Sequence, residues 1–252
     1  NVSMVGGGTI TNAMTFANVG TLNIGDATTD TTTFTGGLTA ITQADGATAI
    51  TLAGTVATSG TSVITLGTSA KKIRLADSTI INSGSGAINL NGAISGSGGD
   101  DDLTINGTGV VTIAQAMTGV RTLATNTGGS VLLKNNITTT GAITLANTLT
   151  IADGVSAIIT SAATADIDQS YQAIAGADGT GENLTLNAGS NGASTITVAG
   201  TITNIDTLAI TDAGIVNFNA AVTVDTLTIP TLVNNVSMVG GGTITNAMTF
   251  AN

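Results

Sequence analysis

Short segments in which apolar and small polar residues alternate recur along the whole chain. A Thr-Leu-x-Ile pattern occurs at residues 21–24, 148–151, 207–210 and 226–229, and a related pattern at 49–52, 63–66 and 87–90. Alternation with a period of two places Val, Leu and Ile on one face of a β-strand and Thr or Asn on the other. Gly, Asn and Asp between the segments permit tight corners. No stretch has helical spacing with a cap, so the pattern predicts an all-β chain of many short strands.

A much longer repeat joins the two ends of the sequence. Residues 1–18 and 235–252 both read NVSMVGGGTITNAMTFAN, so that Asn1 corresponds to Asn235. Chance does not produce such an identity, and a shared fold does not require it. We therefore expect a fragment of a longer tandem array, with residues 1–234 as one repeat unit and residues 235–252 as the start of the next identical unit. The alternative is a short protein with one segment duplicated at both ends.

Weaker internal repetition distinguishes between the all-β folds. Gly8-Thr9-Ile10-Thr11-Asn12 recurs as Gly200-Thr201-Ile202-Thr203-Asn204, while the spacing between related strands varies. β-Sandwiches and antiparallel barrels use longer strands and aromatic core residues, and only 2% of this chain is aromatic. Repeated short strands with variable loops are typical of stacked coils around a narrow aliphatic core. The sequence therefore predicts a parallel β-helix (β-solenoid).

Composition removes several other classes of protein. The chain is 42% hydrophobic with a single proline, whereas disordered segments are rich in charge and proline. The 34 glycines have no three-residue period, which excludes collagen. No apolar run approaches the roughly 18 residues of a membrane span, so we expect no membrane insertion of this segment. With five basic residues and a net charge of −10, we expect no nucleic-acid partner.

Residues 93–120 resemble the autotransporter-associated β-strand repeat, whose pattern is Gly-Gly-x-Leu-x-x-x-Gly-x-Gly-x-Leu-x-Leu. Asp100-Asp101-Asp102 takes the place of a shorter turn, and Val110-Val111-Thr112-Ile113 stands for the second strand. Residues 137–229 resemble the strand repeats of large filamentous-haemagglutinin-like exoproteins. The resemblance implies a right-handed parallel β-helix that is exported and displayed at the cell surface. It carries no functional residue over to this chain.

Few residues offer catalytic chemistry. The chain has no His and no Cys, which removes Ser-His-Asp triads, thiol catalysis and most metal sites. Asp166 and Asp168 would face the same side of a strand and form a carboxylate pair for cleaving polysaccharides. No Arg or Lys lies nearby in the sequence to hold an acidic sugar. We therefore predict that the chain is not an enzyme.

A candidate calcium site lies at Asp100, Asp101 and Asp102. The segment Gly96-Ser97-Gly98-Gly99-Asp100-Asp101-Asp102-Leu103-Thr104 matches the calcium-binding nonapeptide Gly-Gly-x-Gly-x-Asp-x-apolar-x except at Ser97. Such sites form between tandem copies of the nonapeptide, and this chain has one copy. We expect a solvated, exposed acidic turn. The alternative is an ion there, with calcium bound weakly through the carboxylate oxygens and not needed for folding.

Together these patterns predict a structural segment of an extracellular or cell-surface β-solenoid filament. Its partner would be the protein itself, through end-to-end stacking of repeat units. The alternative is the stalk of a large repetitive surface adhesin whose binding tip lies elsewhere. Two remote alternatives are a polysaccharide-processing β-helix enzyme and an ice-binding Thr array. Pairs such as Thr9/Thr11 and Thr201/Thr203 suggest such an array, but they do not recur at one fixed spacing.

Overall fold

Every regular element is a β-strand in the computed structural model, which describes residues 1–41, 46–98, 100–126, 128–161, 167–189, 192–229, 233–246 and 248–250. This confirms the predicted all-β class. Across these residues there is no helix of the length and apolarity needed to cross a membrane. The chain folds as two compact units, residues 1–130 and 131–252. This division does not bear on the predicted repeat boundary at residue 235, which stays a prediction.

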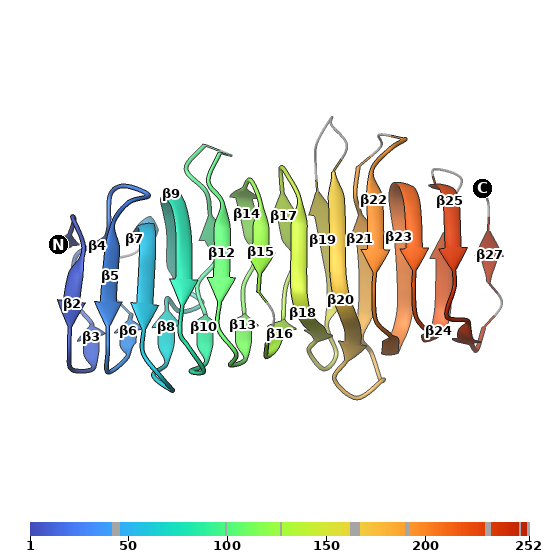
Figure 1. Ribbon diagram of the computed structural model, residues 1–252, viewed down its shortest axis with the longest axis horizontal. Helices are drawn as coiled ribbons and strands as arrows, with labels where there is room; N and C mark the ends of the chain where they lie inside the picture. Colours follow the sequence, from blue (N-terminus) through green and yellow to red (C-terminus); the bar gives the residue numbers. More distant parts are fainter. Residues whose placement is uncertain are drawn as a thin grey trace. The chain divides into compact units, whose positions relative to one another are not determined.

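The first unit is built from short strands connected by tight corners (Figure 1, blue to green). Its strands are β1 (Val2–Met4), β2 (Gly8–Ile10), β3 (Met14–Phe16), β4 (Leu22–Ile24), β5 (Thr31–Phe34), β6 (Leu38–Ala40), β7 (Gly46–Thr58), β8 (Ile64–Leu66), β9 (Lys71–Asn82), β10 (Ile88–Leu90), β11 (Ile94–Ser95), β12 (Leu103–Asn106), β13 (Val111–Ile113), β14 (Met117–Val120) and β15 (Leu123–Thr125), with β16 (Ser130–Leu133) at the unit boundary. Three successive strands, such as β1, β2 and β3, complete one coil.

Strands of successive coils pair in parallel and form three columns. One column runs through β1, β4, β7, β9, β11 and β14, a second through β2, β5, β7, β9, β12 and β15, and a third through β3, β6, β8, β10 and β13. In the third column, paired positions are Met14, Leu38, Ile64, Ile88 and Val111. Parallel stacking of this kind is a β-solenoid, which confirms the predicted fold class.

The alternating pattern of the sequence determines which side chains enter the core. In β8 and β10 the outer residues of each triplet are buried and the middle residue is partly exposed, as in Ile64-Thr65-Leu66. Burying aliphatic side chains on one face is the main stabilising contribution, at roughly 1.5–3 kcal/mol for each fully buried side chain. Phe34 and Phe218 are among the few large aromatic residues in the core. The core is therefore narrow and aliphatic, as the composition indicates.

Two glycines show why the corners need residues without a Cβ atom. Gly25 and Gly54 have φ values of +74° and +69°, which L-residues with side chains rarely adopt. A Cβ at Gly25 would lie 2.1 Å from the Ala53 carbonyl oxygen, and one at Gly54 would lie 2.4 Å from that of Asp30. These corners of successive coils thus stack backbone against backbone.

The second unit repeats this architecture with longer strands that continue around corners (Figure 1, yellow-green to red). Its strands are β17 (Ile137–Thr139), β18 (Ile143–Ile151), β19 (Ser156–Ser161), β20 (Asp168–Gly176), β21 (Asn183–Asn187), β22 (Thr195–Val198), β23 (Ile202–Phe218), β24 (Val222–Ile229), β25 (Val233–Met238), β26 (Gly242–Ile244) and β27 (Thr249–Phe250). One of its parallel columns passes through Leu145, Tyr171, Val198, Phe218 and Met238.

β23 contributes to three sides of the coil within one continuous strand. Its first part pairs with β20, its middle part with β21 and its last part with β22. Asn204 makes the first bend, with a φ of 56°, a left-handed conformation that Asn tolerates better than most residues. The pairing of β23 with β24 shifts register there, between Ile202 and Ile205. The bend positions the polar residues that follow it at a corner.

A buried polar network interrupts the aliphatic core of the second unit. The side chains of Gln169 and Tyr171 are fully or almost fully buried. The Tyr171 hydroxyl donates to Gln169 Oε1 at 2.9 Å, and Gln169 Nε2 donates to Ser161 Oγ at 2.9 Å and to the Asn187 carbonyl oxygen at 2.7 Å. Buried polar groups are tolerated when their hydrogen bonds are satisfied in this way.

The network predicts a loss of stability in alkaline solution. Burial raises the pKa of Tyr171 above its ordinary value of about 10. The unfolded chain releases this proton near pH 10, whereas the folded chain retains it. The contribution of the protonated Tyr171 to the free energy of unfolding is therefore fully present below pH 10. Above pH 10 the free energy of unfolding should fall by up to about 1.4 kcal/mol per pH unit.

Phenolate absorbance reports this directly, because Tyr171 is the only tyrosine. We expect its ionisation to coincide with unfolding followed by circular dichroism. The alkaline loss should be smaller in a Tyr171→Phe variant. A reversible titration near pH 10 in the folded protein would contradict the prediction.

Candidate functional site

The repeated coil, residues 1–18 and again 235–252, has two copies that use opposite edges. In the first copy, β1, β2 and β3 pair with β4, β5 and β6, which follow in the chain. In the second copy, β25, β26 and β27 pair with β23 and β24, which precede them. The same residues form strands in both copies, since β2 (Gly8–Ile10) corresponds to β26 (Gly242–Ile244). The coil therefore adopts the same strand pattern whether its neighbour comes before or after it.

The two copies also use different backbone groups. In the first copy the Val2 N–H donates to the Thr21 carbonyl oxygen at 2.8 Å, and the Met4 and Ile10 carbonyl oxygens each accept a hydrogen bond from the following coil. In the second copy the N–H groups of Val239 and Thr245, equivalent to positions 5 and 11, donate to the preceding coil at 2.9 and 3.2 Å. None of these hydrogen bonds uses an equivalent group in the two copies. One coil of this sequence can thus pair with neighbours on both sides at once.

Core side chains of the repeated coil are covered on one side only. Ile10 is partly exposed, whereas Phe34, its partner in the next coil, is fully buried. In the second copy, Ile244 is partly exposed and Phe250 is 43% exposed. Interior coils bury the corresponding positions. These side chains of the two copies are therefore less buried than those of the coils between them.

The structure corrects one expectation for Asp100, Asp101 and Asp102. Asp100 is exposed, but Asp101 is only 6% exposed. Its Oδ2 accepts hydrogen bonds from the Ser97 N–H at 2.5 Å and from the Ser97 hydroxyl at 2.9 Å, which turns the carboxylate inward. The three residues are thus not a uniformly exposed turn, because local donors hold Asp101 against the fold. Weak calcium binding there stays a prediction.

Asp102 lies in an ion pair with Arg121 on the next coil. Both oxygens of its carboxylate accept hydrogen bonds from the guanidinium, Oδ1 from Nε at 2.8 Å and Oδ2 from Nη2, and the Thr122 hydroxyl donates to Oδ1 at 2.6 Å. The Arg121 hydrogen bonds, with a smaller contribution from Thr122, hold the pKa of the Asp102 carboxyl below its ordinary value. Asp102 is therefore already neutralised by a cation of the protein itself.

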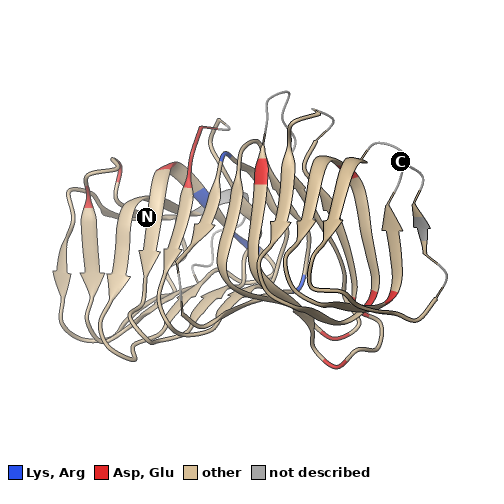
Figure 2. Cartoon of the chain, turned by 45° about the vertical axis from the view of Figure 1, so that its right-hand side comes forward, with Lys and Arg blue, Asp and Glu red and all other residues tan. Residues whose placement is uncertain are grey.

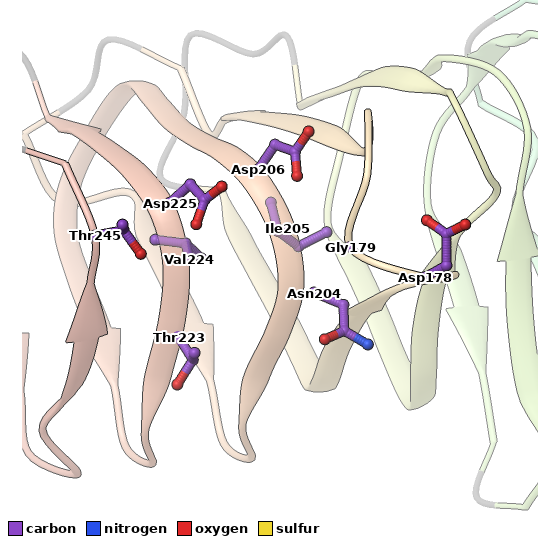
Figure 3. A pocket seen from close by; sticks show the side chains of 9 residues that line it. All are labelled: Asp178, Gly179, Asn204, Ile205, Asp206, Thr223, Val224, Asp225 and Thr245. Carbon is purple, nitrogen blue, oxygen red and sulfur yellow. The ribbon is translucent and has the colours of Figure 1, made fainter.

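The predicted carboxylate pair cannot be evaluated as a pair. Asp166 lies outside the described residues, and Asp168 is the exposed first residue of β20. A polar pocket of about 210 Å³ lies on the second unit instead (Figure 3). Its lining combines residues of β23 and β24 with the loop after β20 and the residue after β26: Asp178, Gly179, Asn204, Ile205, Asp206, Thr223, Val224, Asp225 and Thr245. This lining has three carboxylates and no basic group, so it offers no partner for an acidic sugar.

Sequence reasoning missed an acidic cluster of Asp153, Asp178 and Glu182. One carboxylate oxygen from each lies within 4.8 Å of the others, and among the described residues this is the group of three acidic residues close enough to share a metal ion. Most Asp and Glu residues lie at turns and strand ends (Figure 2). The pairing of the strands shows why these residues become neighbours. Asp153-Gly154 and Asp178-Gly179 are separated by the same offset as Ile151 and Gly176, which pair on successive coils.

Comparisons with known proteins add nothing to the evidence for function, which therefore comes from the fold and these sites. The sequence matches no protein-family model, no curated protein and no solved structure.

Proposed function

We propose that this chain is a structural segment of an extracellular or cell-surface filament, in which β-solenoid repeat units stack along one axis. The observation that supports the proposal most directly is the use of different backbone groups by the two copies of the repeated coil. Val2 and Met4 bond to the following coil, and the positions of Val239 and Thr245 bond to the preceding one. A coil placed between two units can satisfy both sets.

The side-chain columns support the same proposal. Val236 pairs with Val216 in the second unit, and its counterpart Val2 pairs with Leu22 in the first. In a tandem array, one coil of this sequence would lie between two units. Its valine would then pair with the equivalent of Val216 in the preceding unit and with the equivalent of Leu22 in the following unit. Apolar contacts would then continue through the junction, and the half-exposed side chains of the repeated coil would be buried.

The partner in this proposal is a further copy of the repeat unit, with no nucleic acid and no membrane insertion of this segment. Large repetitive surface proteins of the autotransporter and filamentous-haemagglutinin type provide the proposed context. A stalk that carries an adhesive tip elsewhere would use the same stacking. The proposal assigns the segment no catalytic role, since the chain lacks His and Cys. Release of reducing ends from a polysaccharide by the purified chain would contradict that assignment.

Electron microscopy and fibre diffraction of the purified chain test the filament proposal. We expect thin, unbranched fibres with a strong meridional reflection near 4.8 Å, the approximate spacing of paired strands along a solenoid axis (about 4.7–4.9 Å). Their formation should increase with salt, because salt screens repulsion between chains that each carry a net charge of −10. A monomer that stays monodisperse at high concentration and high salt would overturn the proposal.

A further inference from the structure

We propose that Asp153, Asp178 and Glu182 form a calcium-binding site at a corner of the second unit. The three carboxylates come from two successive turns, one between β18 and β19 and the other between β20 and β21. Asp153 and Asp178 are exposed, and Glu182 is fully buried. An ion could therefore enter from solvent past the two aspartates and reach the buried glutamate.

Glu182 supplies the observation that points to a ligand. Its Oε2 accepts a hydrogen bond from the Gly179 N–H at 3.0 Å, whereas no donor group of the described residues bonds to its buried Oε1. The Asp178 carboxyl lies close to the Glu182 carboxyl. No ion pair of these three carboxylates is found among the described residues. A buried carboxylate oxygen without a donor is unfavourable unless a cation approaches it. Both aspartates place a carboxylate oxygen close to that of Glu182, where a cation could contact all three.

The backbone holds the two turns against each other. The Val155 N–H donates to the Ala152 carbonyl oxygen at 3.0 Å and closes the first turn around Asp153. A Cβ added at Gly181 would lie 3.4 Å from the Gly154 Cα atom, so the second turn packs directly on the first.

The second turn is fixed from within. The Thr180 N–H and hydroxyl donate to Asp178 Oδ1 at 3.0 and 2.7 Å, and these bonds lower the pKa of the Asp178 carboxyl. The Gly181 N–H donates to Asp206 Oδ2 at 2.5 Å. Asp178 is thus oriented before any ligand arrives.

The ligand set selects calcium. All donors are oxygens, which favours hard cations such as Ca²⁺ and Mg²⁺ over transition metals. The three carboxylate oxygens lie within 4.8 Å of one another, so one ion could contact all of them. Calcium accepts such an irregular set of oxygens at about 2.3–2.6 Å, whereas magnesium needs near-ideal octahedral geometry. The surrounding charge also favours a cation: residues 131–252 contain eight acidic residues and one basic residue, Lys134.

Calorimetric titration of the chain with CaCl₂ tests the site. We expect saturable binding of one ion with a Kd on the order of 10⁻⁴–10⁻³ M, as in extracellular calcium modules. Asp153→Asn and Glu182→Gln should each weaken this binding at least about tenfold, because each replaces one of the three carboxylates that would contact the ion. Asp168→Asn removes the same charge from an exposed position of the second unit outside this site and should change the Kd by less than about twofold.

Thermal unfolding separates binding from simple charge screening. Calcium should raise the midpoint of the wild-type chain, and MgCl₂ at the same ionic strength should raise it much less. In EDTA, Glu182→Gln should be at least as stable as the wild type, because its amide can donate a hydrogen bond to a neighbouring carboxylate. Circular dichroism confirms that each variant is folded, and Asp153→Asn changes only an exposed residue. Absence of saturable binding, equal effects of Mg²⁺ and Ca²⁺, or an unchanged Kd in Asp153→Asn and Glu182→Gln would overturn the proposal.

Discussion

Ile10→Lys is expected to abolish fibre formation while leaving the chain folded. Ile10 lies at the partly exposed end of the column that continues into the buried Phe34. At this position the lysine ammonium can reach solvent as long as no coil covers it. A coil stacked on β2 would bury the charge without a partner, which costs several kcal/mol. Because a head-to-tail junction needs this face of every molecule, one substitution should leave only monomers.

Two further variants test whether the effect of Ile10→Lys depends on this apolar face and not on the added charge alone. Ile244→Lys alters the equivalent position of the second copy and should block the same junction from the other side. Thr9→Lys adds the same charge to an exposed position of the same strand and should still form fibres. Analytical ultracentrifugation and electron microscopy measure the outcome. Fibres of Ile10→Lys with the abundance and length of the wild type would show that the junction does not use this face.

Leu66→Asp is expected to be the most destabilising of the substitutions considered. Leu66 is fully buried, and it pairs with Ala40 and Leu90 in the coils on either side. An aspartate there loses the apolar burial and places an unpaired carboxylate in the core, which should lower the free energy of unfolding by about 4 kcal/mol or more. Each coil of a solenoid is stabilised by its neighbours, so the defect should also weaken the coils that flank Leu66.

Urea denaturation followed by circular dichroism measures this loss. Thr65→Asp is the matched control, because Thr65 is the adjacent residue of the same strand and points away from the core. Its free energy of unfolding should change by less than about 1 kcal/mol. Equal effects of the two substitutions would contradict the assignment of the inner and outer faces of β8.

The sequence predicted the strands and their inner faces because both depend on local alternation. Ile64-Thr65-Leu66 and Ile88-Asn89-Leu90 were expected as strands with buried outer residues, and the structure confirms both. Parallel stacking followed from repetition, since similar short strands that recur with variable loops are typical of stacked coils. Corner glycines such as Gly54 fit the expectation that turns need positive φ angles.

The candidate sites were harder to predict because they depend on which residues of different coils become neighbours. Coil length varies along the chain: Leu22 pairs with Ile50 and Ile50 pairs with Ile73, so the first of these two coils is the longer one. An offset between two acidic residues therefore has no fixed meaning until the pairing is known. The three adjacent aspartates were conspicuous in the sequence, yet Arg121 of the next coil already pairs with Asp102.

The two edges of the repeated coil use separate backbone groups. This feature also bears on how repeat units could be added to such a protein or deleted from it. If each junction in an array is formed by the same repeated coil, adding or deleting a whole repeat unit leaves every remaining junction chemically unchanged. No new interface has to be optimised when the copy number rises or falls. The length of the proposed filament would then change in steps of one unit, with no substitution in the folded protein.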